Sequence, residues 1–313
     1  MRNKSKSTLY SSLPDSSAGR SRGFIIAQGS SIVRVLVTVL LIVFICLVIL
    51  LTIPYRNGHH IYRINIKQKA QLKSIDTAVE LFSSEFEGYP PSDAIDEDGK
   101  SYCGAMKLCE AVMGRDLQGV HPDSVFRSDG MDSMRKVLYP VETGMFSKEI
   151  SDSLIARKGP YLPLESANAY TMADLFGEGN TGPFEPNHFV LCDVFRHVKL
   201  RGTGKKTGIP ILYYKANTSE TAHNIDDPDD PNNIYDYKDN HALLALGVPG
   251  KPGVKHPMYE NPKIFYEIIK DYKDTTRSKP NNVETFILLS AGHDGLYGTK
   301  DDIVNFEMGW KPQ

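Results

Sequence analysis

Three aspartates lie close together in a short segment near the carboxy terminus. The segment HDGLYGTKDD (residues 293–302) places Asp294, Asp301 and Asp302 close together around two glycines. Carboxylate and carbonyl oxygens on a loop bent by glycine are the ligands that a hard cation such as Ca²⁺ prefers. The same residues also suit a pair of Asp/Gly turns that join two strands without a metal. The spacing is not that of an EF-hand, so the residues alone leave both interpretations open.

The sequence contains no recognisable catalytic motif. The nine histidines form no His-x-x-x-His pattern, and no Cys-x-x-Cys pair occurs. A Gly-x-Ser-x-Gly elbow, a phosphate-binding loop and a dinucleotide fingerprint are also missing from the sequence. The fragment GTGKKTG (residues 202–208) resembles a phosphate loop in composition alone, and it predicts a basic hairpin turn. We therefore expect a protein that is not an enzyme.

The four cysteines are too few for a disulfide scaffold. Cys103 and Cys109 could form a bridge if the segment between them turns back on itself. Two cysteines six positions apart on one continuous helix lie on different faces and cannot be bridged. The alternative is two small buried side chains, and the sequence leaves the choice open.

Charge and composition exclude a nucleic-acid partner. The chain of 313 residues has a formal net charge of -2. Its basic residues are spread along the sequence and do not gather on one predicted element. We expect no nucleic-acid binding.

An apolar run from Val35 to Ile53 must form one long helix near the start of the chain. It contains no charged residue, and Pro54 follows it directly. At about 1.5 Å per residue a helix of this length would span roughly 28 Å, which is close to the hydrocarbon thickness of a bilayer. The sequence therefore predicts a transmembrane helix at 32–54, with the lipid bilayer as a partner, after a cytoplasmic leader or juxtamembrane segment at 1–31.

An amphipathic pattern follows the apolar run. Large apolar residues recur at steps of three and four, with charged residues between them. The pattern predicts a helix at 55–88 that continues the anchor after a break or kink near Pro54 to Gly58. This helix is expected to end at the Gly-Tyr-Pro-Pro stretch of residues 88–91. The stripe includes Ile61, Ile64, Leu72, Ile75, Val79, Phe82 and Phe86.

The remaining residues predict a mixture of short helices and strands. Strands are expected at 189–195, 209–215 and 285–291, because β-branched and aromatic residues are flanked there by turn residues. Helices are expected at 104–113, 131–138 and 262–272. Long connections rich in Gly, Pro, Asn and Asp separate these elements. The fold class is therefore α+β, with a small antiparallel sheet and large loop insertions.

The order of these features resembles the pseudopilins of bacterial type II secretion systems. The resemblance covers the apolar helix, the amphipathic helix ending in Gly-Tyr-Pro, and the final stretch SAGHDGLYGTKDDIVNF, that is, residues 32–91 and about 284–306. The chain looks most like an enlarged relative of the major pseudopilin or another prepilin-like protein. The resemblance implies one long amino-terminal helix packed on a small sheet, in a single-pass inner-membrane protein whose domain at 89–313 lies in the periplasm.

The resemblance also implies a set of Ca²⁺ ligands in the carboxy-terminal loop. Carried over residue by residue, Asp294 matches the Asp of the family's Ala-Asp-Gly stretch, with His293 inserted before it. Asp301 and Asp302 match the later acidic ligands, and the carbonyl groups of Leu296 and Ile303 complete the set.

Prepilin processing and assembly are the other implied properties. Cleavage after Gly23 would leave Phe24 as the first residue of the mature chain. The family has a Glu five residues into the mature chain, where this sequence has Gln28, which cannot form the expected ion pair with a neighbouring amino group. The alternative is an uncleaved juxtamembrane linker.

Three functions remain in competition. The first is a structural subunit that associates with its own copies or with other pseudopilins through Gln28 and the stripe Ile61 to Phe86. The second is a solitary tethered binding module with pilin-like architecture, whose enlarged middle binds a secreted protein substrate or a polysaccharide. The third is a tethered enzyme with a dispersed site. The first is the function that the sequence favours.

Overall fold

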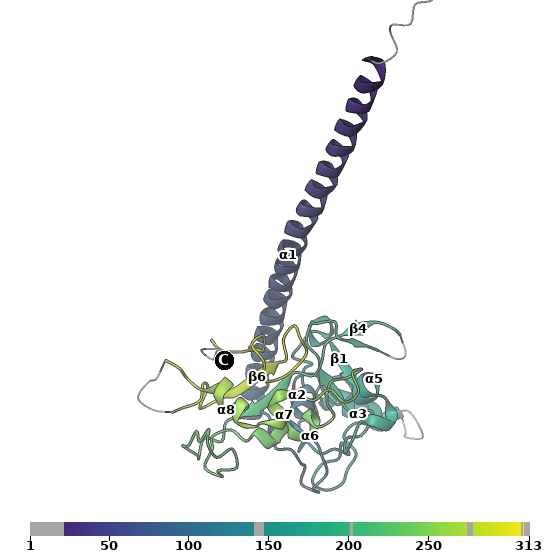
Figure 1. Ribbon diagram of the computed structural model, residues 1–313. Helices are drawn as coiled ribbons and strands as arrows, with labels where there is room; N and C mark the ends of the chain where they lie inside the picture. The colour runs from purple at the N-terminus through teal and green to yellow at the C-terminus, as the bar shows by residue number, and fades with distance from the viewer. Residues whose placement is uncertain (1–21, 141–146, 201–202, 274–277, 308, 310–313) are drawn as a thin grey trace, which may run out of the picture. The chain divides into compact units, whose positions relative to one another are not determined.

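The computed structural model describes most of the chain as an α+β protein with small antiparallel sheets (Figure 1). It describes residues 22–140, 147–200, 203–273, 278–307 and 309, with the backbone alone at 22–32, 49–59 and 147. The chain divides into two compact units, Met1–His59 and His60–Gln313. The predicted fold class is therefore right in being α+β with small antiparallel sheets.

Helix α1 (Arg22–Phe86) is the longest element and contributes to both units. It runs through Pro54 without the predicted break, although proline removes one hydrogen bond from a helix interior. It ends one residue before Glu87, whose φ of 58° is left-handed, and Gly88 and Pro90 follow. The predicted end of the amphipathic helix is thus confirmed to within two residues.

The predicted membrane crossing is overturned. Within the residues that the structure describes, no helix has a stretch both long enough and apolar enough to span a bilayer. The prediction of a transmembrane helix at 32–54 is corrected accordingly, together with the single-pass inner-membrane and periplasmic localisation.

The central sheet of the second unit has three antiparallel strands in the order β5-β6-β7. They are β5 (Leu212–Lys215), β6 (Phe286–Ser290) and β7 (Ile303–Val304). Leu212 pairs with Leu289, and Ser290 pairs with Ile303. All five residues of β6 are buried, so both faces of this strand are covered.

Alternation along the strands assigns side chains to two hydrophobic clusters. Phe286 and Leu288 pack with Leu72, Ile75 and Val79 of α1 in one cluster. The intervening residues of β6, Ile287 and Leu289, belong to the other cluster, with Phe265 and Ile268 of helix α8 (Lys263–Ile269). Successive strand residues point to opposite faces, so α1 covers one face of the sheet and α8 the other.

Helix α2 (Gly104–Met113) lies in the interior and contacts both β5 and the strand β2 (Phe189–Leu191). All of its residues are buried, including Lys107 and Glu110. Gly104 is required there, because a Cβ atom at this position would lie 2.3 Å from the carbonyl oxygen of Tyr213. This helix agrees with the predicted range of 104–113.

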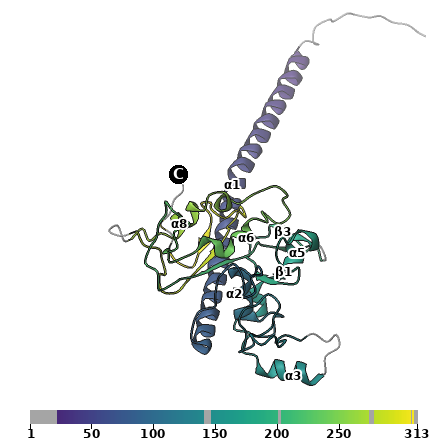
Figure 2. The same cartoon turned by 90° about the horizontal axis from the view of Figure 1, so that it is seen from below.

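Two smaller sheets and several short helices complete the second unit (Figure 2). Strand β1 (Ala169–Thr171) pairs with β2, and β3 (Val198–Lys199) pairs with β4 (Lys206–Thr207), both antiparallel. The β3–β4 hairpin confirms the basic turn predicted at 202–208. The remaining elements are α3 (Ser147–Ala156), α4 (Leu164–Ala167), α5 (Met172–Phe176), η1 (Glu178–Asn180), η2 (Tyr237–Asn240), α6 (His241–Leu244) and α7 (Pro257–Glu260).

The prediction of a helix at 131–138 is wrong. The segment instead forms a turn that is closed by a bridge between Met131 and Val137. The carboxylate of Asp132 accepts hydrogen bonds from the backbone nitrogens of Met134 and Lys136, and Arg135 has a φ of 67°. A short acidic side chain that binds nearby backbone N–H groups competes with helix formation.

Candidate functional site

The acidic loop between β6 and β7 is closed by a glycine. Gly292 has a φ of 65°, and a Cβ atom there would lie 2.1 Å from the carbonyl oxygen of Asp301. A side chain at this position would therefore force the two ends of the loop apart. Gly295 and Gly298 also have positive φ values and bend the loop between these ends.

The carboxylates of Asp294 and Asp301 bind groups of the loop itself. Asp294 Oδ1 accepts a hydrogen bond from Leu296 N at 2.7 Å. Asp301 Oδ2 accepts from Asp294 N at 2.8 Å, and its Oδ1 accepts from the Thr299 hydroxyl at 2.7 Å. The bond from Leu296 N to Asp294 is that of an Asx turn, and the three bonds together hold the loop without a metal.

Asp302 is the buried member of the group. Its Oδ2 accepts from Gly298 N at 2.7 Å, whereas Oδ1 is buried without a hydrogen-bond partner in the described structure. Burial raises the pKa of Asp302 well above its ordinary value, and the neighbouring charge of Asp301 adds to this. Burial, followed by the charge of Asp301, also raises the pKa of Asp294. Protons or a cation would relieve this concentration of carboxylates.

The predicted ligand set is only partly assembled. Leu296 O accepts from the Thr299 hydroxyl at 3.2 Å, and Ile303 is paired with Ser290 in the sheet. Among the described residues, no three His, Cys, Asp or Glu side chains converge in a way that could hold a metal ion. Asp294, Asp301 and Asp302 nevertheless lie in one loop, as expected. Calcium binding therefore stays a prediction.

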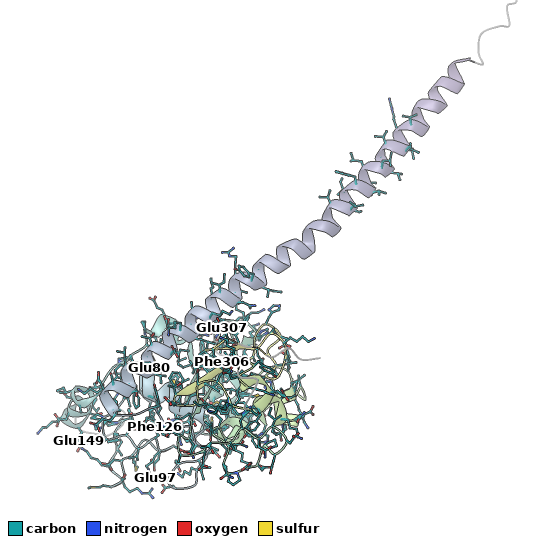
Figure 3. All side chains as sticks on the ribbon, turned by 90° about the vertical axis from the view of Figure 1, so that its left-hand side faces the viewer. Glu80, Glu97, Phe126, Glu149, Phe306 and Glu307 are labelled. Carbon is teal, nitrogen blue, oxygen red and sulfur yellow. The ribbon has the colours of Figure 1, made fainter. Side chains whose placement is uncertain are left out.

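A second candidate site is the apolar segment of α1 in the first unit. Every large apolar residue from Val33 to Val48 is exposed, with exposed fractions between 41% at Val48 and 66% at Phe44. The run is nearly continuous in sequence, so its side chains lie on all sides of the helix, and Figure 3 shows side chains projecting in several directions along this segment. We call these residues the apolar segment.

The predicted assembly stripe lies in the second unit and is mainly a core element. Leu72, Ile75, Val79 and Phe82 are at most 2% exposed. Phe82 stacks on Phe86, with ring centroids 4.3 Å apart. These side chains are used within one molecule and are not available to a neighbour.

Ile61 and Ile64 are only half-buried, and Ile64 packs at the edge of the α1 cluster. The outward face of the same part of α1 carries Tyr62, Ile66 and Leu81, which are 65%, 50% and 47% exposed. Further contacts between molecules would therefore involve these residues. The sequence pattern did not single them out, because they lie off the main stripe.

Three predicted residues lie where only the backbone is described. Gly23, Phe24 and Gln28 belong to the first turns of α1, and their side chains fall outside the described structure. Cleavage after Gly23 and the role of Gln28 in assembly remain predictions.

The cysteine alternatives are resolved in favour of free thiols. All four cysteines are unbridged; Cys46 is exposed, and Cys103, Cys109 and Cys192 are buried. Burial raises the pKa of Cys103 to about 11 and those of Cys109 and Cys192 further. The bridge between Cys103 and Cys109 does not form because Cys109 lies on the continuous helix α2, which Cys103 immediately precedes.

Sequence reasoning missed a group of buried polar residues in the second unit. Glu110 accepts hydrogen bonds from the hydroxyls of Tyr102, Ser124 and Tyr139 at 2.5, 2.6 and 3.0 Å. Only the position of Glu110 on a largely apolar helix could have indicated its burial. The group holds the segment after α2 against the helix.

Comparison of the chain with protein-family models, with curated proteins and with solved structures finds no match.

Proposed function

We propose that this protein is a structural subunit that assembles with its own copies through the apolar segment of α1, in a role similar to that of pseudopilins. The observation that carries the proposal is the exposure of the apolar segment on all sides of the helix. A helix that is apolar all round requires apolar neighbours all round. Nothing else in the described part of the chain covers it.

The free energy available from covering this segment is large. Phe44, Leu36 and Leu40 are 66%, 61% and 59% exposed. Full burial of one such side chain is worth roughly 1.5–3 kcal/mol, so covering the exposed half gains about 1 kcal/mol for each residue. Summed over the segment, this favours association strongly.

Other copies of the same helix are the partner that fits the all-round exposure. A single partner helix covers one stripe of its neighbour, and several surrounding helices are needed to cover every side. Copies of one chain supply such surroundings by repetition of the same contact.

Site-specific photo-crosslinking in cells that make the full chain tests this proposal. A photoreactive amino acid is placed in turn at Leu36, Leu41 and Ile42, which are exposed and lie on three different sides of the helix. We expect a ladder of crosslinked multimers from all three positions. Met134, which is 91% exposed in the second unit, is the matched control and should give little crosslinking.

A product from only one of the three helix positions would contradict all-round packing and indicate a single partner. Monomer alone from all three, with normal amounts of the protein, would refute assembly through this segment. Mass spectrometry of the crosslinked bands decides whether the partner is a second copy or another protein.

A further inference from the structure

A pocket of about 410 Å³ in the second unit is built from four separate segments. One wall is α1 at Lys67 to Ser74, and the second is the end of α4 at Glu165 to Asn168. The third is the segment Asp193 to Arg196 after β2. The fourth is the basic hairpin at Lys205 to Thr207. None of these segments belongs to the acidic loop or to the apolar segment.

The walls carry an excess of positive charge. Lys67, Arg196, Lys205 and Lys206 all line the pocket, and all are exposed. None of the four forms an ion pair with a residue that the structure describes.

Two acids also line this pocket. They are Glu165 and Asp193, and burial raises the pKa of Asp193 well above its ordinary value, which favours its neutral form. The cations therefore outnumber the ionised acids. A concave site with one sign of charge concentrates the field and attracts the opposite charge.

Hydrogen bonds hold the walls in place. Gln71 Nε2 donates to Ser166 O at 3.1 Å and to Cys192 O at 2.9 Å. Asn168 Nδ2 donates to Asp193 O at 2.7 Å and to Thr207 Oγ1 at 3.0 Å. All four segments are thus tied together by two amide side chains. The pocket is formed before any ligand arrives.

One wall residue has an unused acceptor. Gln71 is 7% exposed, and its Oε1 has no hydrogen-bond partner in the described structure. Both hydrogen bonds of its Nε2 go to carbonyl oxygens, so the amide cannot be flipped without losing them. A buried acceptor without a donor costs about 1–3 kcal/mol. A ligand hydroxyl beside the anionic group would supply that donor.

We propose that this pocket binds a small ligand that carries a phosphate or carboxylate group next to a hydroxyl. Four side-chain cations around a preformed concavity provide charge-assisted hydrogen bonds to the anionic oxygens. The ammonium group of Lys205 also lies 5.8 Å from the ring centroid of Tyr170. The ligand's hydroxyl is recognised by Gln71.

Titration calorimetry on the full chain tests the pocket with two probes, glucose 6-phosphate and glucuronate, which carry hydroxyls beside a phosphate and a carboxylate. Inorganic phosphate is the third probe and has no carbon-bound hydroxyl. We expect saturable binding of at least one sugar probe, weaker binding of inorganic phosphate, and lower affinity at high ionic strength. The preferred sugar probe identifies the anionic group.

Arg196→Gln and Lys206→Gln should each weaken binding about tenfold, because one charge-assisted hydrogen bond is worth about 1.5–3 kcal/mol. Lys199→Gln is the matched control: Lys199 pairs with Lys206 across the hairpin but does not line the pocket. It removes the same charge and should change the affinity less than twofold. Unchanged circular dichroism shows that each variant is folded.

Two results would overturn the proposal. The first is an equal loss of affinity in Lys199→Gln, which would indicate a general effect of surface charge. The second is the absence of saturable binding of all three probes by the folded wild-type protein. Neither result bears on assembly through the apolar segment.

Discussion

The hydroxyl of Ser92 donates a hydrogen bond to Oδ2 of Asp239, and both side chains are buried. Ser92 Oγ in turn accepts from Lys215 N at 3.0 Å, so the pair connects η2 to the start of the segment after α1 and to β5. Burial raises the pKa of Asp239 to about 8, against an ordinary value of 3.8. This buried carboxyl group therefore links the stability of the second unit to pH.

The free energy of unfolding of Asp239→Asn, measured relative to that of wild type, should increase as the pH rises from 4 to 8. In that interval the unfolded chain has lost the Asp239 proton while the folded chain retains it, so wild-type stability from this group falls with rising pH, by up to about 1.4 kcal/mol per pH unit. Asparagine keeps the size and has no proton to lose. Urea unfolding of both proteins at pH 4, 6 and 8 measures the difference, and a constant difference would contradict the assigned shift.

Three buried histidines should make the same unit sensitive to acid. Burial lowers the pKa values of His188, His223 and His256 to about 4. Between about pH 6.5 and pH 4 the unfolded chain takes up protons that the folded chain does not, so stability falls as the pH falls. His223→Gln should reduce the loss of stability between pH 7 and pH 5. A variant with the wild-type slope would show that His223 is protonated in the folded protein.

Neighbouring residues on α1 should differ sharply in their effect on folding. Phe82 is 2% exposed and packs with Phe126 and Tyr161, whereas Leu81 is 47% exposed. Phe82→Ala should lower the free energy of unfolding by about 3–5 kcal/mol, since it leaves a cavity. Leu81→Ala should change it by less than about 1 kcal/mol. Chemical unfolding followed by circular dichroism measures both, and similar losses would disprove the assignment of faces.

Calcium should stabilise the acidic loop. The protein is melted in Ca²⁺ and in a chelator, and we expect a higher midpoint with the metal, because a ligand that binds only the folded state stabilises it. Asp294→Ala and Asp301→Ala should abolish the difference. Asp226→Ala is the control, because its side chain is 99% exposed outside the loop. Equal midpoints of the wild-type protein in both solutions would leave the loop as a pair of Asp/Gly turns.

Asp302→Asn separates the metal from the structural interpretation. Burial raises the pKa of Asp302, so a neutral amide should stabilise the metal-free loop at neutral pH while removing a predicted Ca²⁺ ligand. The variant should melt higher than wild type in chelator and show a smaller gain with Ca²⁺. A lower midpoint in chelator would mean that the ionised carboxylate is needed by the fold itself.

Much of the secondary structure follows from local patterns. The helix at Gly104–Met113 and the strands β5 and β6 lie within the predicted ranges, because their apolar content and turn-rich flanks act locally. Strand β2 also lies within a predicted range, whereas its partner β1 was not predicted, because it is stabilised by pairing with β2 across an intervening helix, which no local pattern reveals. At 131–138 a local pattern predicted a helix that does not form. There the side chain of Asp132 binds nearby backbone N–H groups and favours a turn instead.

The binding features were less predictable than the fold. The acidic loop is continuous in sequence, so its three carboxylates could be found directly. The basic pocket joins Lys67, Arg196 and Lys206, which are far apart in the chain and meet only after α1 packs beside the hairpin. The GTGKKTG fragment is the only part of the pocket with a recognisable sequence pattern. It predicted a basic turn but not the three other segments that line the pocket.

The burial of three of the four thiols has a consequence for how the protein can be handled. Cys103, Cys109 and Cys192 are enclosed, and burial raises their pKa values, so little thiolate is present to react with oxidants or alkylating reagents. The second unit contains no other cysteine. Its covalent structure is therefore the same under oxidising and reducing conditions, and a label attached through sulfur to the native protein marks Cys46 alone.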